Sequence, residues 1–239
     1  MNALEFADAS SAARNKGELF ETFLNAVGAH GFDQVAFGAI TGHESFQARH
    51  PDPIVEVNYR QDWLDHYFAC GYHEVDPCVT VMPTTDQMLF WSDVKRPSAR
   101  FSRKQRQLFL ESEEAGMNDG FTIPMHATGG RTFIVSLATT ARGQDIRRAA
   151  GRLRPIAFEF FFAYMALHGW TTPEVSLSAR ERECLTWGAQ GKTSWEIGQI
   201  LNVSENTVNY HFKTAMGRLG CSNRTVAVVR AVQLGLIRP

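Results

Sequence analysis

The segment from Leu177 to Pro239 constrains the fold of this chain more than any other stretch. Its apolar residues recur at helical spacing in four short blocks, and a turn signal separates each block from the next. The blocks cover about 180–190, 193–201, 205–219 and 223–234. This pattern predicts four short helices around a small core of their own.

Capping signals indicate where these helices begin and end. Ser178 with Glu181 three residues later has the spacing of a capping box, and Gly191 ends the first helix. Ser204 can cap the third helix, and Gly220 ends it. We expect the apolar stripe of each helix to face the core. The stripes of the second and fourth helices are Ile197, Ile200, Leu201, Val226, Val229, Val232 and Leu234.

The short connection Asn202-Val203-Ser204 joins the second and third helices, which predicts a helix-turn-helix whose second helix can enter a DNA major groove. The outward face of that helix carries side chains suited to base edges and phosphates. They are Asn206, Asn209, Tyr210, Lys213 and Thr214. Any solvated helix also has a polar outer face, so spacing alone leaves both interpretations open.

This segment resembles the DNA-binding domain of LuxR-type transcription regulators. The matching residues include Glu181, Trp187, Gly191, Lys192, Thr193, Glu196, Ile197, Leu201, Thr207, Val208, His211, Lys213, Leu219, Gly235 and Ile237. The resemblance implies that Asn209, Tyr210 and Lys213 contact bases and phosphates. It also implies that Lys192 and Thr193 meet the DNA backbone. The family often has Phe where this chain has Tyr210, so the chain departs from the family at one of the residues expected to contact DNA.

Charge is distributed unevenly along the chain, whose formal net charge is −1. From Ser176 onward eight Lys and Arg stand against four Glu, which leaves 16 basic against 21 acidic residues before it. A basic part attached to an acidic part is expected where only the basic part meets phosphates. The excess modestly favours double-stranded DNA as a partner.

Composition indicates an ordinary soluble protein, with 44% hydrophobic and 21% charged residues. The sequence has no apolar run long enough to cross a bilayer and no signal-peptide pattern, so we expect a cytoplasmic protein that does not bind membranes. The cysteines Cys70, Cys78, Cys184 and Cys221 and the eight scattered histidines show no paired metal-ligand spacing. The sequence therefore predicts no metal and no cofactor.

Residues 1–168 mix helical and strand patterns, which predicts an α+β fold. The first residues are polar and helix-prone, and the long helix over 145–168 contains Pro155, where we expect a kink or a break. The other expected helices cover about 17–30, 61–70, 78–82 and 102–115, and the strands 32–40, 54–58, 121–126 and 132–139, the last two joined by a Thr-Gly-Gly turn. This order predicts an N-terminal α/β/α sandwich with an antiparallel sheet, followed by an all-α, four-helix helix-turn-helix domain.

An aromatic and acidic cluster lies between residues 59 and 91. Tyr59, Trp63 and Tyr67 are four residues apart and would share one face of a helix, and Asp76 and Trp91 follow. Spacing alone favours a core seam with polar groups at its rim. The alternative is a ligand pocket, mostly apolar with a few convergent polar groups.

The pattern of Asn58-Tyr59, Trp63, Tyr67, Asp76-Pro77, Trp91 and Gly120 resembles the autoinducer-binding domain of the same LuxR family. That resemblance implies a pocket for an N-acyl-homoserine lactone. Trp63 would donate to the lactone carbonyl, Asp76 would accept from the amide N–H, and Tyr59 would donate to the amide carbonyl. Ser136 would assist Tyr59, while Tyr67 and Trp91 would form walls of the site.

An acyl tail would need an apolar wall, for which the candidates are Ala36, Gly38, Ile40, Val79, Met82 and Ile134. Ile134 shares a strand face with Ser136 and could shorten or narrow the pocket. We further expect that an empty pocket leaves the Asp76 carboxylate poorly satisfied, because a buried carboxylate needs a donor.

The expected domains are 1–168 for autoinducer binding and dimerisation, 169–175 as a linker, and 176–239 for DNA binding. The resemblance implies a homodimer on a pseudo-palindromic site, with the fourth helix as a second dimer contact, and it admits RNA polymerase as a further partner. An orphan regulator answering to another small signal, or to none, is the alternative. A response regulator would need βαβ alternation, and a lactone-degrading enzyme would need catalytic groups, and the sequence shows neither.

Overall fold

The computed structural model describes residues 1–40, 55–127, 131–167 and 175–238. These residues form two compact units, one before residue 168 and one after residue 174. The first unit mixes helices with an antiparallel sheet, and the second is helical, so the predicted fold class is confirmed. No helix within the described ranges combines the length and the apolar composition that a bilayer span requires.

The first unit is built on a five-stranded antiparallel sheet whose described strands have the order β2-β1-β5-β4-β3. The strands are β1 Gln34–Ala39, β2 Val55–Val57, β3 Leu89–Phe90, β4 Asp119–Ala127 and β5 Arg131–Thr139. The register of β4 against β5 sets Thr122 opposite Ser136 and Gly120 opposite Ala138. The predicted turn between these two strands lies outside the described residues.

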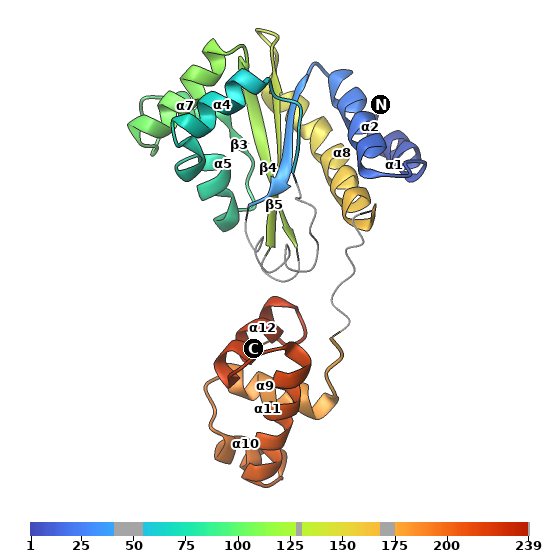
Figure 1. The fold of residues 1–239 in the computed structure, drawn as a ribbon, viewed down its shortest axis with the longest axis vertical. Coiled ribbons are helices and arrows are strands. Elements are labelled where there is room, and N and C mark those ends of the chain that lie inside the picture. Colours follow the sequence, from blue (N-terminus) through green and yellow to red (C-terminus); the bar gives the residue numbers. More distant parts are fainter. Residues whose placement is uncertain (41–54, 128–130, 168–174, 239) are drawn as a thin grey trace. The chain divides into compact units, whose positions relative to one another are not determined.

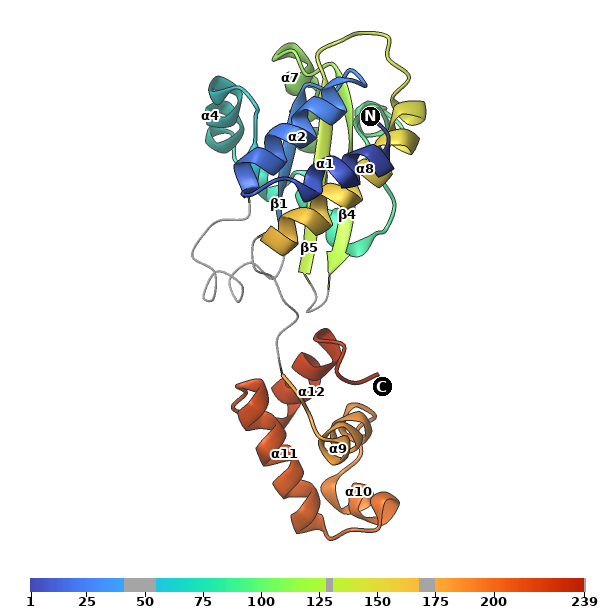
Figure 2. The ribbon, with the colours of Figure 1, turned by 90° about the vertical axis from the view of Figure 1, so that its right-hand side faces the viewer.

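Helices α1 (Ala3–Ser11), α2 (Lys16–Gly28) and α8 (Ile146–Leu167) cover one face of the sheet (Figures 1 and 2). The core between them is rich in phenylalanine. Phe23 stacks on Phe160 with ring centroids 4.2 Å apart, and Phe37 of β1 meets Phe160 edge-on at 5.1 Å. Large offset and edge-on aromatic contacts of this kind fix α2 and α8 against the sheet.

Shorter elements cover the opposite face (Figure 1). They are α4 Gln61–Ala69, the 3-10 turns η1 Tyr72–Glu74 and η2 Met82–Thr84, α5 Pro77–Thr80, α6 Trp91–Lys95 and α7 Arg103–Glu114. A second group of buried residues, including Trp63, Trp91 and Phe109, lies between these elements and the sheet. The two faces are therefore packed by separate sets of side chains.

The helix-prone N-terminus forms α1 and buries Phe6 completely. Two other features of the first unit differ from the sequence prediction. Tyr59 precedes α4, whose N-cap is Arg60, so it does not share a helix with Trp63 and Tyr67. Pro155 leaves α8 as one helix. Pro155 is exposed, and it provides no N–H for the carbonyl four residues earlier in the helix. That carbonyl can bond to water instead, so the helix continues through the proline.

The second unit contains the four predicted helices, which are α9 Ala179–Ala189, α10 Ser194–Leu201, α11 Glu205–Leu219 and α12 Arg224–Gln233. The expected capping box of Ser178 and Glu181 is present. Glu181 is almost completely buried and also accepts from Arg218 of α11 at 3.1 Å. One carboxylate therefore caps α9 and ties it to the end of α11.

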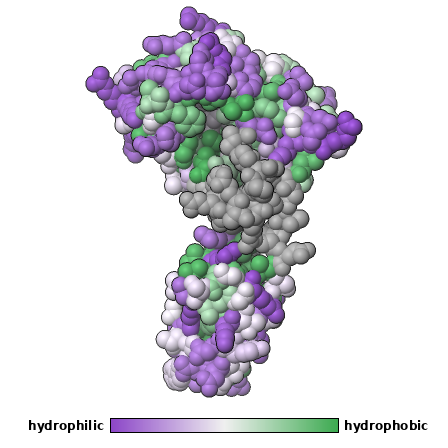
Figure 3. Space-filling model, in the orientation of Figure 1, coloured by the Kyte–Doolittle hydropathy of each residue, from purple (hydrophilic) through white to green (hydrophobic). Residues whose placement is uncertain are grey.

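Part of the predicted core of this unit is wrong. Ile200 is 45% exposed, and Val226, Val229 and Val232 of α12 are also exposed. The inner face of α12 is formed instead by Ala227 and Ala231, both fully buried, because small residues let this helix approach its neighbours closely. Figure 3 shows apolar surface at the end of the unit formed by α12.

We predict that Gly120→Ala destabilises the first unit by about 1–3 kcal/mol, the usual cost of overpacking. A Cβ at this position would lie 2.5 Å from the Leu137 carbonyl oxygen and 3.1 Å from the Trp91 ring. Gly28→Ala is the control, because Gly28 is exposed and a Cβ there meets nothing within 4 Å. Calorimetric melting of both variants measures the difference, and equal melting temperatures would contradict the close packing at Gly120.

Candidate functional site

A cavity of about 260 Å³ lies in the first unit, between the sheet and the helices of the α4 and α7 side. Its sheet wall includes Ala36 of β1 and Ile134 and Ser136 of β5. Strand residues alternate between the two faces, so the neighbours Phe37 and Val135 point instead into the phenylalanine-rich core. The cavity is slightly smaller than the usual range for ligand pockets, about 300–1,000 Å³, and its lining is predominantly apolar.

Most of the residues that the sequence suggested for a pocket do line this cavity. They are Ala36, Tyr59, Trp63, Tyr67, Asp76, Val79, Trp91, Ile134 and Ser136. Gly38, Ile40 and Met82 are not among the described lining residues. Met82 is buried in the same cluster as Trp63 and Trp91, and Ile40 packs against that cluster.

Sequence reasoning missed a further set of lining residues: Val57, Leu64, Phe68, Cys78, Leu108, Phe109, Ser112 and Met117. Three of them, Leu108, Phe109 and Ser112, form the inner side of α7. The helical period reveals that these side chains face inward. It does not reveal that α7 packs on the same sheet face as α4, and that pairing is what brings them to the cavity.

Asp76 lies at the N-cap of α5 and is buried. One carboxylate oxygen accepts from the Cys78 backbone N–H at 2.8 Å, and the other accepts from the Tyr67 hydroxyl at 3.0 Å. The expectation that this carboxylate is poorly satisfied without a ligand is therefore wrong, because the protein supplies two donors. Burial nevertheless dominates and raises the pKa of Asp76 above its usual value.

Two hydrogen-bond donors that line the cavity together with Asp76 have no acceptor among the described residues. The Tyr59 hydroxyl and the Trp63 indole N–H make no hydrogen bond to the part of the chain that the structure describes. Burial, with Cys78 and Asp76 nearby, raises the pKa of Tyr59, so its hydroxyl stays protonated. The cavity thus offers two unused donors and a carboxylate with lone pairs to spare.

Another set of polar groups forms a continuous chain along the wall. Thr122 Oγ1 accepts from Trp91 Nε1 at 3.3 Å and lies 2.8 Å from Ser136 Oγ and 3.1 Å from Cys78 Sγ. These contacts satisfy the Trp91 indole N–H inside the protein. Trp91 therefore presents its ring to the cavity, as a wall residue would.

The second unit presents α11 as an exposed polar face. Asn206, Asn209 and Lys213 are exposed, and Tyr210 is 64% exposed. At the start of α10, Thr193 is the N-cap and Lys192 pairs with Glu196 at 3.6 Å. The tight connection between α10 and α11 has Asn202 at φ +53°, a conformation that Asn tolerates better than most residues. This arrangement is a helix-turn-helix with its second helix open to solvent.

The side chain of Asn209 is more constrained in orientation than its exposed position on this face predicts. Its side-chain carbonyl accepts from the Ser194 hydroxyl at 2.7 Å, and that hydroxyl accepts from Arg224 of α12 at 2.8 Å. The amide N–H groups are left to face outward. Asn209 is thus arranged to donate to a phosphate or a base acceptor rather than to pair with both groups of an adenine edge.

Comparison with known families agrees with this geometry. Residues 15–164 match the model of the autoinducer binding domain, and residues 175–231 match that of the bacterial regulatory proteins of the luxR family. This chain belongs to the LuxR family. It is an autoinducer-binding transcription regulator of quorum sensing, as the resemblance implied.

Relatives match along most of this chain and most of their own length. The chain is 32% identical to the transcriptional activator protein VanR of Vibrio anguillarum, over 84% of this chain and 87% of VanR. It is 31% identical to the quorum sensing-dependent regulator RpaR of Rhodopseudomonas palustris, over 99% and 95%. Escherichia coli SdiA, solved in complex with octanoyl-rac-glycerol, has the same fold at 22% identity, with a TM-score of 0.69 over 98% of this chain and 94% of SdiA.

We predict that Asp76→Asn changes how stability depends on pH. Burial raises the folded-state pKa of Asp76. Below the unfolded-state pKa of about 4 the carboxyl is neutral in both states and does not lower the stability of the protein. Stability is then lost as the pH rises through the folded-state pKa. Asn keeps an acceptor oxygen for the Cys78 N–H, and its NH₂ group can donate to the Tyr67 hydroxyl, which both donates and accepts, but Asn does not titrate. The melting temperature of the wild type should therefore fall relative to that of the variant from pH 4 upward, and a difference that stays constant over this range would contradict the burial argument.

Proposed function

We propose that the first unit, within residues 1–168, binds an N-acyl-homoserine lactone, and that residues 176–239 bind a palindromic DNA site as part of a homodimer. Residues 169–175 would link the two. The observation that carries the ligand assignment is the pair of unused donors, from Tyr59 and Trp63, beside the buried carboxylate of Asp76. An acyl-homoserine lactone has two carbonyls and one amide N–H, which is the complementary set.

Each polar group of the ligand has a candidate partner. Trp63 would donate to the lactone carbonyl, and Tyr59 would donate to the amide carbonyl, with Ser136 assisting. The ligand amide N–H would donate to Asp76, which accepts a third hydrogen bond without losing the two it already has. Tyr67 would hold Asp76 in place from the wall of the cavity, opposite the ring of Trp91.

The acyl tail would lie against Ala36, Val79 and Ile134. Burial of each CH₂ contributes roughly 0.8 kcal/mol, so the length of the apolar wall sets much of the affinity. Ile134 is a large side chain in a cavity of about 260 Å³, which favours a short or medium tail. Filling the cavity would stabilise the first unit by mass action, which is the simplest route from signal to response.

On the DNA side, α11 would enter the major groove, with Asn206, Asn209, Tyr210 and Lys213 facing the bases and phosphates. Lys192 and Thr193 would contact the backbone. The exposed valines of α12 support a second dimer contact there, because an apolar stripe on a surface helix commonly marks an interface. Two copies would then read half-sites about one helical turn apart, and RNA polymerase would be a further partner.

A different acylated signal is the second candidate. SdiA holds octanoyl-rac-glycerol in the same fold, and a glycerol ester also brings a carbonyl and hydroxyl donors to a carboxylate. Such a ligand lacks the amide N–H. In the second candidate a hydroxyl would take the place of the amide N–H as the donor to Asp76, and the mass of the recovered ligand distinguishes the two.

We predict that cells fed a mixed panel of acyl-homoserine lactones and octanoylglycerol yield purified protein carrying one short- or medium-chain lactone, identified by mass spectrometry. Asp76→Asn should retain less than about a tenth of it, since a hydrogen bond to a charged group contributes about 1.5–3 kcal/mol. Asp86→Ala, an exposed carboxylate elsewhere in this unit, is the control. Folded wild-type protein with no bound lactone would overturn the assignment. Recovery of octanoylglycerol would favour the second candidate. Recovery of the lactone with the longest tail would contradict the idea that Ile134 narrows the cavity.

We also predict that Lys213→Ala weakens DNA binding and lowers the salt slope of log K by about one, as expected for the loss of one phosphate contact. Lys104→Ala, in the first unit, matches the change in charge and should leave the slope unchanged. Fluorescence anisotropy with a promoter fragment at several salt concentrations measures both variants. An unchanged slope in Lys213→Ala would show that Lys213 does not meet a phosphate.

A further inference from the structure

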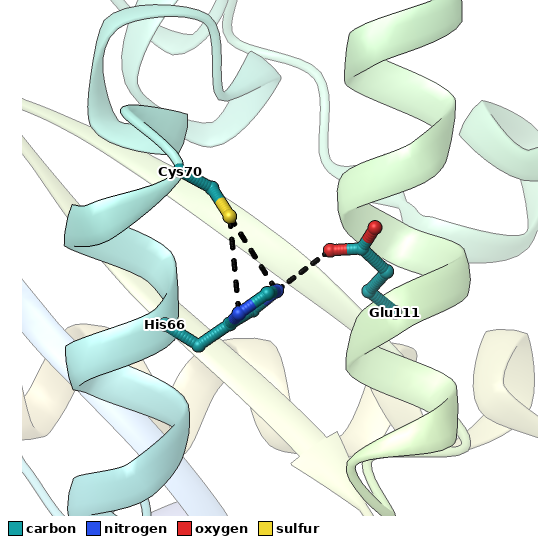
Figure 4. Close-up of side chains that lie close together, drawn as sticks. All are labelled: His66, Cys70 and Glu111. Atoms are coloured by element: carbon teal, nitrogen blue, oxygen red, sulfur yellow. Dashed lines mark hydrogen bonds and ion pairs between the residues drawn. The ribbon is translucent and has the colours of Figure 1, made fainter.

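Three potential metal ligands meet between α4 and α7 (Figure 4), on the side of these helices that does not line the cavity. His66 and Cys70 lie one helical turn apart on α4 and its C-cap, and Glu111 faces them from α7. His66 Nε2 is 2.7 Å from Glu111 Oε2, and Cys70 Sγ is 3.7 Å from His66 Nε2. The ligand atoms, which are nitrogen, sulfur and oxygen, all lie within 4.8 Å of one another.

We propose that His66, Cys70 and Glu111 bind a zinc ion that joins α4 to α7. Zinc takes imidazole nitrogen, thiolate sulfur and carboxylate oxygen at about 2.0–2.3 Å in tetrahedral geometry, so the ligand atoms around it lie roughly 3.5 Å apart. The nitrogen and sulfur already have this separation. Insertion of the metal requires the His66–Glu111 contact to open by less than about 1 Å, which small side-chain rotations provide.

The surroundings of Glu111 support a ligand role. The Tyr72 hydroxyl donates to Glu111 Oε2 at 2.6 Å, and the Gln107 amide donates to Oε1 at 2.6 Å. Groups that orient a ligand in this way commonly change metal affinity 10- to 100-fold.

The fourth zinc ligand would be water. A hollow of about 360 Å³ opens beside His66 and Glu111, and Arg60, Asp62 and Glu114 also line it. The three ligands are themselves only partly buried, so both the metal and the water have access. On binding, the Cys70 thiol releases its proton to solvent, and neutral His66 supplies a lone pair.

A zinc ion here would act on the cavity walls, because α4 and α7 each have a second face turned toward the cavity. Tyr67 lines it from α4, and Leu108 and Phe109 line it from α7. A metal that joins the outer faces fixes the distance between these two walls. The metal would have this effect whichever signal the cavity binds.

The sequence predicted no metal, because its cysteines and histidines show no paired metal-ligand spacing. The mixed pair His66-x-x-x-Cys70 has helical ligand spacing, which was a usable signal. Glu111 is 45 residues further on in the sequence and meets His66 only through the packing of α7 on α4. No periodicity in the sequence predicts that contact.

Cobalt(II) titration of the metal-free full-length protein tests the proposal. The wild type should show intense tetrahedral d–d bands and a thiolate-to-cobalt charge-transfer band, and Zn²⁺ should abolish both. Cys70→Ser should remove the charge-transfer band, and His66→Ala and Glu111→Gln should each weaken cobalt binding more than about tenfold. Cys221→Ser and His73→Ala, which change a partly exposed cysteine and an exposed histidine outside the cluster, should behave as the wild type.

Zinc should also raise the melting temperature of the wild type and not that of Cys70→Ser, because the metal joins two helices. A charge-transfer band that persists in Cys70→Ser would overturn the proposal, as would equal cobalt affinity in all variants. Absence of any thiolate band in folded wild-type protein would show that His66 and Glu111 form only a hydrogen-bonded pair.

Discussion

The two-residue period of the strands is the constraint on which the first unit depends. In β4 and β5, Phe121, Ile123, Val135 and Leu137 enter the phenylalanine-rich core, while Thr122 and Ser136 face the other way. Dense packing against the helices on one face holds the sheet in place, so the other face can carry small and polar residues. The cavity exists because the second face is covered by short helices that leave part of it unfilled.

Among the described residues, several polar groups on that second face are paired within the protein. Thr122 joins Trp91, Ser136 and Cys78, and Asp76 is held by Cys78 and Tyr67. A buried polar group without a partner is costly, so the donors of Tyr59 and Trp63 stand out against this background. The unpaired groups, more than the apolar lining, distinguish a binding cavity from a packing defect.

Local patterns in the sequence predicted much of this molecule. The helices of the second unit, the β4–β5 hairpin and nine residues of the cavity follow from hydrophobic period, capping signals and family resemblance. The errors came from packing between distant segments. Ile200 was expected inside from its spacing, yet α10 is short and only one side of it meets the other helices. Likewise, the partners of Asp76 depend on where Tyr67 lies after α4 has packed on the sheet, which no local pattern contains.

Arg224 couples two surfaces of the second unit. It extends from α12 over the ring of Phe212 at 3.8 Å, donates to the Lys192 carbonyl at 2.7 Å, and donates to the Ser194 hydroxyl that in turn holds Asn209. The orientation of Asn209 on α11 is therefore set partly by α12, the helix that carries the exposed valines. A genetic screen for altered operator preference should accordingly return substitutions at Arg224 and its neighbours on α12, although these residues lie off the outward face of α11.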